Sequence, residues 1–262
     1  MSTPSPSPVR FDRTDGVAEI VLAGGRGNPI DLSWADAFEA AVASIASEDR
    51  CVLLRAHGPD FCFGGDVGTF VGDDPGALIR SLADRLHVSI RLLDAVEVPV
   101  VTAVQGWATA AGMSLALTSD ILLVGEGARF KTAYNALGLT ADGGMTWYLP
   151  RRVPATVAAD LLLTDRVLTA DEALHLGLAA RVVPDDALAD EARALAIGIA
   201  GRSRPAAVAV KRLLRQATDG DLSSHLDAET DAIAAAAAGP DGREGVAAFL
   251  ERRAPRFGHA GA

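Results

Sequence analysis

The stretch from Glu97 to Asp120 places the strongest constraint on the fold of this chain. It opens with a β-branched apolar run, Val98 to Val104, of the kind that forms a strand buried on both faces. Small residues follow from Ala108 to Gly112, and apolar residues then recur at helical spacing. A strand, a small-residue turn and a helix in this order predict backbone N–H groups that point towards a ligand.

Two plainer interpretations of the same stretch need to be weighed. A membrane span is disfavoured because Pro99, Gln105 and the polar run from Thr118 to Asp120 interrupt the apolar residues. A strand–helix unit with a purely structural role stays open on spacing alone. No Lys or Arg lies in the turn, so a polarised carbonyl group suits it better as a ligand than a phosphate.

The composition is that of an ordinary globular protein. The chain has 262 residues, of which 49% are hydrophobic and 22% charged, enough for one large domain with an appendage. A net charge of −10 gives no case for nucleic acid or an anionic membrane as partner. Cys51 and Cys62, without a secretory signal, predict a cytoplasmic protein, and with His57 they fall short of a zinc site, so no metal is expected.

Strands alternate with helices up to about residue 184, and helices alone follow. We expect strands at 17–22, 51–55, 98–104, 121–124 and 181–183, helices at 34–46, 77–95, 155–163 and 170–176, and a mostly irregular segment at 125–150. This order predicts an α/β core over residues 9–200 and a helical C-terminal region over residues 201–262. Residues 1–8 are expected to form a disordered tail.

Several motifs in the same order resemble the crotonase (enoyl-CoA hydratase/isomerase) superfamily over roughly residues 9–258. The matching pieces are HGPDFCFGGD (57–66), VPVVTAVQGWATAAGMSLALTSDI (98–121), ARFKTAYNALGLTADGGMTWYLPR (128–151), TADEALHLGLAARVV (169–183) and FLERRAPRF (249–257). The resemblance implies a crotonase-like spiral of ββα units and a C-terminal helical region that builds trimers or dimers of trimers. It also implies an acyl-CoA thioester substrate, with coenzyme A entering as part of that substrate and no separate cofactor.

The resemblance further implies an oxyanion hole formed by the backbone N–H groups of Gly65 and Ala111. Removal of a proton next to a thioester creates an enolate, and two aimed donors stabilise its oxygen. Loss of one such donor typically costs about 3–4 kcal/mol of transition-state stabilisation.

The acid and base vary within this superfamily. Enoyl-CoA hydratases carry two glutamates, and the corresponding positions here hold Ser114 and Tyr134, so two-glutamate hydration is disfavoured. Asp142, in GLTADGGMTWYLPR (138–151), resembles the aspartate of the epoxyphenylacetyl-CoA isomerase branch. One carboxylate suits a 1,3-shift, because it removes a proton and returns it at another carbon. The structural alternative for Asp142 is a loop aspartate that accepts bonds from local N–H groups.

Other functions stay open. The set His87, Tyr134 and Asp142 also resembles 4-chlorobenzoyl-CoA dehalogenase, although a tryptophan takes the place of Tyr134 there. His87 alternatively packs in its helix beside Leu82 and Leu86. Hydration, acyl-CoA binding without catalysis, and RNA binding through the basic run Lys211–Arg215 are further alternatives, the last disfavoured by the net charge.

The remaining assignments concern substrate contacts. Arg26, in a glycine-rich turn, matches a loop that contacts the coenzyme A nucleotide in this family, and Lys211 matches a helix that reaches the coenzyme A phosphate from a neighbouring subunit. A solvated basic residue is the alternative for each of them. We expect Phe63, Asp66, Phe70, Trp107 and Ser114 to line the acyl pocket. For the large aromatic residues, packing in the core is the default alternative.

Overall fold

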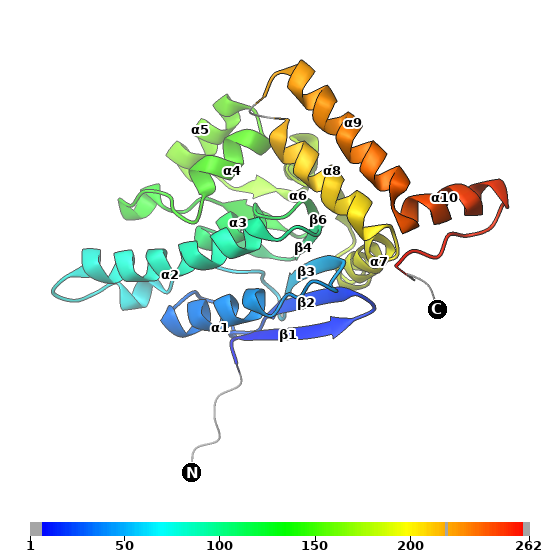
Figure 1. Cartoon of the computed structure of the whole chain (residues 1–262). Helices are drawn as coiled ribbons and strands as arrows, with labels where there is room; N and C mark the ends of the chain where they lie inside the picture. The colour runs from blue at the N-terminus through cyan, green and yellow to red at the C-terminus, as the bar shows by residue number, and fades with distance from the viewer. Residues whose placement is uncertain (1–6, 218–219, 259–262) are drawn as a thin grey trace, which may run out of the picture.

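The computed structural model describes residues 7–217 and 220–258, and its centre is a six-stranded sheet (Figure 1). In spatial order the strands are β1 (Val9–Thr14), β2 (Val17–Leu22), β3 (Cys51–Ala56), β4 (Val100–Val104), β6 (Ile121–Gly125) and β9 (Arg181–Val183). Only β1 runs antiparallel to its neighbour, and all the other pairs are parallel.

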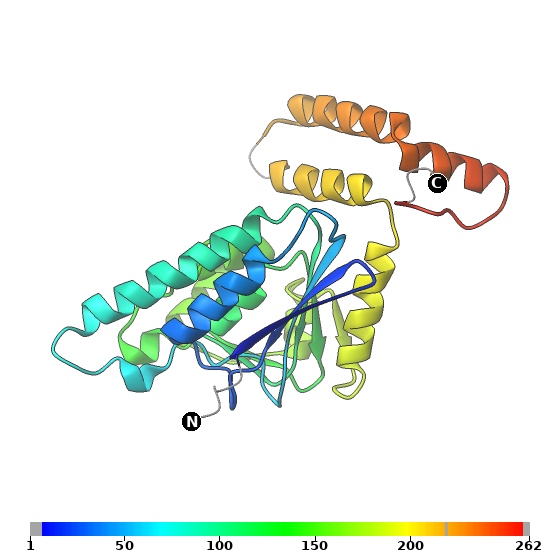
Figure 2. The same cartoon turned by 60° about the horizontal axis from the view of Figure 1, so that its bottom comes forward.

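Helices cover both faces of this sheet, as Figure 2 shows. Helices α1 (Leu32–Ala43) and α2 (Pro75–Ala95) lie on one face, and α7 (Leu188–Ala200) packs against β3 and β4 on the other. Leu54 belongs to the core on the first side, whereas its neighbour Leu53 packs with Ala192 of α7 and its surroundings. Successive strand residues thus alternate between two buried faces, which explains the continuous apolar runs in the sequence.

A second row of strands runs beside the first. Strands β5 (Trp107–Thr109), β7 (Arg129–Lys131) and β8 (Leu168–Thr169) form a three-stranded sheet, and β5 and β7 each directly follow a strand of the large sheet. Isolated bridges between Ile30 and Gly65 and between Cys62 and Ala108 extend this row towards the N-terminus. The predicted spiral of ββα units is confirmed, and it brings residues 62–65 alongside residues 108–111.

The helices on the site side begin at clear caps. The Asp31 carboxylate accepts a hydrogen bond from Trp34 N at 2.7 Å at the start of α1. Asp74 caps α2 in the same way through Ala77 N, and Pro75 lies in its first turn. Both helices therefore start two residues before the predicted positions 34 and 77.

The segment 125–150 is more regular than expected. It contains β7, a 3₁₀ turn η2 (Asn135–Leu137) and helix α4 (Met145–Arg152). A three-residue strand and an eight-residue helix are too short to give a clear periodicity, and this is why the pattern missed them. Strand β1 was missed for a related reason: Val9 is its one fully buried residue.

Residues 1–6 of the tail expected to be disordered lie outside the described residues. The next two residues differ from that expectation. The carbonyl oxygen of Pro8 accepts a hydrogen bond from Ala23 N at 2.7 Å, so the described chain joins the fold before residue 9.

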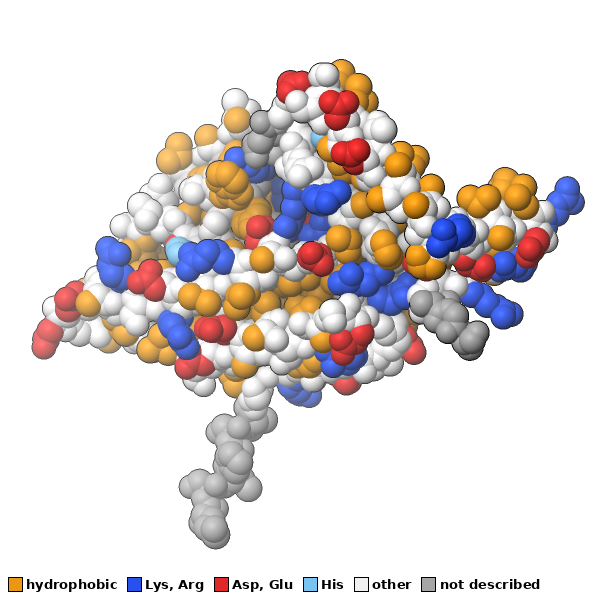
Figure 3. All heavy atoms as spheres, viewed as in Figure 1, with side chains coloured by type: hydrophobic (Ala, Val, Ile, Leu, Met, Phe, Trp, Pro, Cys, Tyr) orange, Lys and Arg blue, Asp and Glu red, His pale blue; other side chains and the backbone are white. Residues whose placement is uncertain are grey.

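Helices α5 (Ala155–Thr164) and α6 (Ala170–His175) complete the core, and α8 (Arg204–Gln216), α9 (Leu222–Ala238) and α10 (Pro240–Leu250) extend away from it (Figures 1 and 2). These last three helices expose large apolar side chains, coloured orange over α9 and α10 in Figure 3. The exposed set is Val210, Leu214, Leu222, Leu226, Ile233, Val246, Phe249 and Leu250. Across the residues described, no helix is both long and apolar enough to cross a membrane.

Candidate active site

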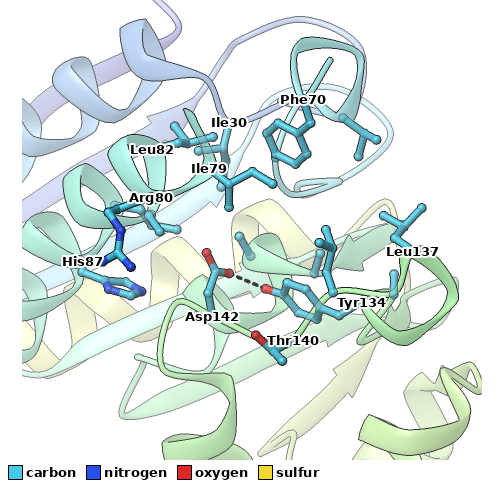
Figure 4. Close-up of a pocket in the computed structure, with 18 of the residues that line it drawn as sticks. Ile30, Phe70, Ile79, Arg80, Leu82, His87, Tyr134, Leu137, Thr140 and Asp142 are labelled. Atoms are coloured by element: carbon cyan, nitrogen blue, oxygen red, sulfur yellow. Dashed lines mark hydrogen bonds between the residues drawn. The ribbon is translucent and has the colours of Figure 1, made fainter. Parts of the chain in front are cut away.

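A cleft of about 480 Å³ lies between α2 and the loop that follows β7 (Figure 4). Its walls come from five segments: Ile30 before α1, the glycine-rich loop after β3, residues 76–87 of α2, the turn at the start of the short helix α3 (Ala111–Ala116), and residues 133–142. The lining includes Ile30, Phe63, Gly65, Phe70, Ile79, Arg80, Leu82, Asp84, His87, Ala110, Ala111, Tyr134, Leu137, Leu139, Thr140 and Asp142.

Gly65 and Ala111 both line this cleft. In the described part of the chain neither amide has a hydrogen-bond acceptor. The two segments meet closely at Gly64, where a Cβ would lie 2.8 Å from Ala110 Cβ and 3.1 Å from Ala111 N. Two free N–H donors on adjacent segments are the arrangement that binds an oxyanion.

Ala110 has an unusual backbone conformation at this point, with φ of 47° and ψ of −127°. Positive φ is unfavourable for alanine and costs of the order of 1–3 kcal/mol. Its N–H donates to Lys131 O of β7 and its carbonyl accepts from Ser114 N, and these two bonds hold the turn in place. The strained turn orients the following amide, that of Ala111.

The carboxylate of Asp142 faces the cleft and is held by Tyr134, as the dashed line in Figure 4 marks. The Tyr134 hydroxyl donates to Asp142 Oδ1 at 2.6 Å. Burial of the ring, and next the charge of Asp142, raise the pKa of Tyr134. Tyr134 therefore stays protonated and acts as a donor to the carboxylate.

Two further side chains hold the backbone around Asp142. Ser114 Oγ of α3 donates to the carbonyl oxygen of Asp142 at 2.8 Å. On the other side, Gly143 N donates to His87 Nε2 of α2 at 3.1 Å, which requires an unprotonated Nε2. Side chains from three parts of the fold thus form hydrogen bonds with Asp142 or its loop. This argues against the structural alternative, in which the Asp142 carboxylate only accepts hydrogen bonds from neighbouring N–H groups.

The predicted acyl-pocket residues separate into two groups. Phe63 and Phe70 line the cleft as expected. Ser114 does not line it, because the residue is fully buried and its hydroxyl donates to the carbonyl oxygen of Asp142. Asp66 and Trp107 are also absent from the lining: the Asp66 carboxylate accepts from Gly68 N at the start of a 3₁₀ turn, and Trp107 lies on β5. These three pocket assignments are therefore corrected.

Comparison with known proteins identifies the family. The sequence profile of the enoyl-CoA hydratase/isomerase family matches residues 12–260. The chain belongs to the enoyl-CoA hydratase/isomerase family. It is 36% identical over 211 residues to 1,2-epoxyphenylacetyl-CoA isomerase from Escherichia coli K12, which covers 79% of this chain and 80% of that protein. It is 33% identical over 214 residues to enoyl-CoA hydratase EchA19 from Mycobacterium tuberculosis, covering 79% of each chain.

Solved structures agree with this assignment. The crystal structure of an enoyl-CoA hydratase from Polaromonas sp. JS666 superposes with a TM-score of 0.89 at 28% identity, covering 95% of this chain and 99% of that one. The structure of enoyl-CoA hydratase from Bacillus anthracis gives a TM-score of 0.90 at 27% identity, with coverage of 95% and 98%. The crotonase fold is therefore shown, while relatives of this family carry the names of both hydratases and isomerases.

Lys211 has a different place from the one that the family resemblance implied. Its ammonium group is buried, 2.7 Å from Asp120 Oδ2, and donates to Val98 O at 2.8 Å. Burial lowers the pKa of Lys211, and the nearby Asp120 carboxylate opposes that effect. Lys211 thus joins α8 to the core and is not a free cation at the cleft. Arg26 is exposed in the turn after β2, and its contact with coenzyme A stays a prediction.

Two charged residues of the cleft were missed in the sequence. Arg80 and Asp84 line it beside His87, on one face of α2. Their spacing of i, i+4 and i+7 was a usable signal, because residues so spaced share a helix face. The apolar residues of α2 predicted the face of this helix that packs on the core, and no role was predicted for the polar face.

Proposed function

We propose that this protein isomerises an enoyl-CoA thioester by moving a double bond or rearranging an epoxide, with Asp142 as the acid and base. The observation that carries the proposal is the Asp142 carboxylate, which lines the same cleft as the free amides of Gly65 and Ala111. Coenzyme A enters as part of the substrate, no separate cofactor takes part, and the reaction belongs in the cytoplasm.

The chemistry follows from this arrangement. In a 3-enoyl-CoA, Asp142 would take a proton from C2, and the electron pair would pass to the thioester oxygen. The Gly65 and Ala111 amides would stabilise the resulting dienolate oxygen. The same carboxyl group would then return the proton at C4, which gives the conjugated 2-enoyl-CoA without a net change in charge.

The hydrogen-bond pattern supports proton transfer over the dehalogenase-like alternative. In that alternative His87 has to activate water, but its Nε2 accepts a bond from Gly143 N and holds the loop. Hydration is the second candidate, and one observation favours it: Asp84 supplies a second carboxylate to the cleft.

A direct experiment separates these reactions. The purified protein is incubated in D₂O with a trans-3-enoyl-CoA, with crotonyl-CoA and with 4-chlorobenzoyl-CoA. We expect conjugation of the 3-enoyl ester with deuterium incorporated at C2 or C4, seen by absorbance and mass. Faster water addition to crotonyl-CoA would favour hydration, and acyl-CoA binding without any exchange would favour a non-catalytic protein.

The groups that hold Asp142 should matter less than Asp142 itself. Tyr134→Phe removes the hydroxyl that donates at 2.6 Å, and Ser114→Ala removes the bond to the Asp142 carbonyl. Each should lower kcat by about tenfold or less, which corresponds to roughly one neutral or charge-assisted hydrogen bond. Steady-state rates with a 3-enoyl-CoA measure this. A loss from Tyr134→Phe as large as that from removing the carboxylate would instead make the phenol the proton donor.

We also propose that the chain forms homotrimers, or dimers of trimers, through helices α8–α10. Eight large apolar side chains are exposed on these helices, and a surface of that kind is typical of an interface between subunits. Light scattering should give a mass of at least three chains of 27.0 kDa each.

Substitutions on α9 and α10 test this assembly. Ile233→Asp and Phe249→Asp should each reduce the mass towards that of one chain, because a charge is placed in the interface. Val71→Asp is the matched control, since Val71 is equally exposed but lies in the loop before α2. A stable monomer of the parent protein at micromolar concentration would contradict the proposal.

A further inference from the structure

Asn28, in the turn between β2 and α1, is a fully buried polar residue whose amide bonds only to main-chain atoms. Its Oδ1 accepts from Gly24 N at 2.8 Å, and its Nδ2 donates to Phe61 O at 2.9 Å and to Asp60 O at 3.3 Å. An N–H on one side and two carbonyl oxygens on the other require both the acceptor and the donor of an amide. The side chain therefore joins this turn to the glycine-rich loop after β3.

The backbone of the same turn pairs with the loop on both sides of Gly65. Ile30 N donates to Gly64 O at 2.8 Å, and Asp66 N donates to Ile30 O at 3.1 Å, which together make the bridge between Ile30 and Gly65. Asn28 has a φ of 43°, a left-handed conformation that asparagine tolerates better than most residues. The place of Ile30, two residues further along, depends on this turn.

The bond from Ile30 fixes the peptide group that carries the proposed oxyanion donor. Gly64 C=O and Gly65 N–H belong to one planar trans peptide, in which the two groups point in opposite directions. With the carbonyl oxygen held by Ile30 N, the N–H points away from the turn and the peptide plane is not free to rotate. The same bond polarises the peptide and strengthens its N–H as a donor.

We propose that Asn28 is a positioning residue of the oxyanion hole, which acts through Ile30 to direct the Gly65 N–H at the thioester oxygen. Asn28 does not line the cleft, so it acts without touching the substrate. The inference rests on the proposed function for the thioester alone. A merely structural Asn28 would affect stability, whereas a positioning residue also determines how strongly a bound thioester is polarised.

Isotope-edited infrared spectroscopy measures this polarisation without turnover. Hexanoyl-CoA labelled with ¹³C at the thioester carbonyl is bound at saturation, and the parent protein should shift the carbonyl stretch below its value in water. Asn28→Asp keeps the acceptor for Gly24 N but loses the donor to Phe61 O, so it should lose most of this shift. Asn28→Gly should do the same, since it tolerates the positive φ and buries no charge.

The rates should divide in a way that a loss of stability does not produce. With a 3-enoyl-CoA, kcat of both folded Asn28 variants should fall about 10–10²-fold, as expected for a displaced donor. KM should change little, because the hole binds the enolate oxygen more strongly than the ground-state carbonyl.

Gln105→Glu is the matched control. Gln105 Nε2 donates to Ala56 O and to Gly58 O, each at 3.0 Å, so the same change from amide to carboxylate removes two bonds at the start of the same loop. This variant should melt at a lower temperature and keep the carbonyl shift. An equal loss of the shift in Gln105→Glu would overturn the inference, and so would a full shift in the folded Asn28 variants.

Turnover then separates the two proposals. A parent protein that shifts the carbonyl stretch without isomerising a 3-enoyl-CoA retains the role of Asn28 and removes the isomerase. Isomerisation that proceeds at the parent kcat in the Asn28 variants retains the proposed function and removes the role of Asn28. A parent protein that leaves the carbonyl stretch unshifted contradicts the hole at Gly65 and Ala111, and both proposals with it.

Discussion

Replacing Asp142 by Asn should lower isomerisation of a 3-enoyl-CoA by about 10²–10⁴-fold, the usual contribution of a positioned acid or base. The amide has the same shape and still accepts the hydrogen bond from Tyr134, so the loop should stay in place. Deuterium exchange at C2 and double-bond migration should fall together, because one group performs both steps. Binding of a saturated acyl-CoA should change little.

Asp84→Asn provides the matched control for this result. Asp84 also lines the cleft, but it is exposed and no described hydrogen bond orients it. Its replacement should leave isomerisation close to the parent rate. An Asp142→Asn protein that isomerises at the parent rate would remove Asp142 as the base, and a covalent adduct on Asp142 with a halo-aryl-CoA would indicate the dehalogenase-like reaction.

The second large effect is expected at Gly64, where the two segments of the proposed oxyanion hole meet. An alanine Cβ there would come within 2.8 Å of Ala110 Cβ and 3.0 Å of Thr109 O, at a φ of +88°. The backbone has to shift, and with it the amides of Gly65 and Ala111. Because a misplaced donor acts much like a missing one, Gly64→Ala should reduce kcat by about 10²-fold or more.

Gly58→Ala separates this geometric effect from general backbone strain. Gly58 also has a left-handed conformation, with φ of +98°, but a Cβ there meets no atom within 4 Å. Both variants should lose thermal stability, whereas only Gly64→Ala should lose turnover. Equal kcat values for the two folded variants would show that the hole lies elsewhere.

The sheet was largely predictable from the sequence because its strands are buried on both faces. Residues such as Leu53 and Leu54 face different helices, so β3 is apolar at every position except Arg55 and the run is easy to recognise. The second row of strands was not predictable in this way. Strands β5, β7 and β8 have two or three residues each, which is too short for a periodicity, and they are specified by pairing with distant turns of the spiral.

In the site, three residues defined by backbone or loop position line one cleft, and their catalytic roles stay predictions. Gly65, Ala111 and Asp142 fall there because the motif fixes their place along the chain. Residue type alone did not reveal the direction of a side chain. Ser114 lies one turn beyond Ala111 yet turns its hydroxyl to the Asp142 backbone. Lys211 was predicted to contact coenzyme A, although its ammonium group is buried with Asp120 and Val98 as partners.

The buried contact of Lys211 has a consequence for assembly. Its ammonium group ties α8 to Val98, just before β4, and to Asp120, just before β6. Helix α8 begins the arm on which the exposed apolar side chains lie, so the direction of that arm is set within a single chain. A partner that binds this arm finds helix α8 already fixed relative to the core, so association costs little conformational entropy.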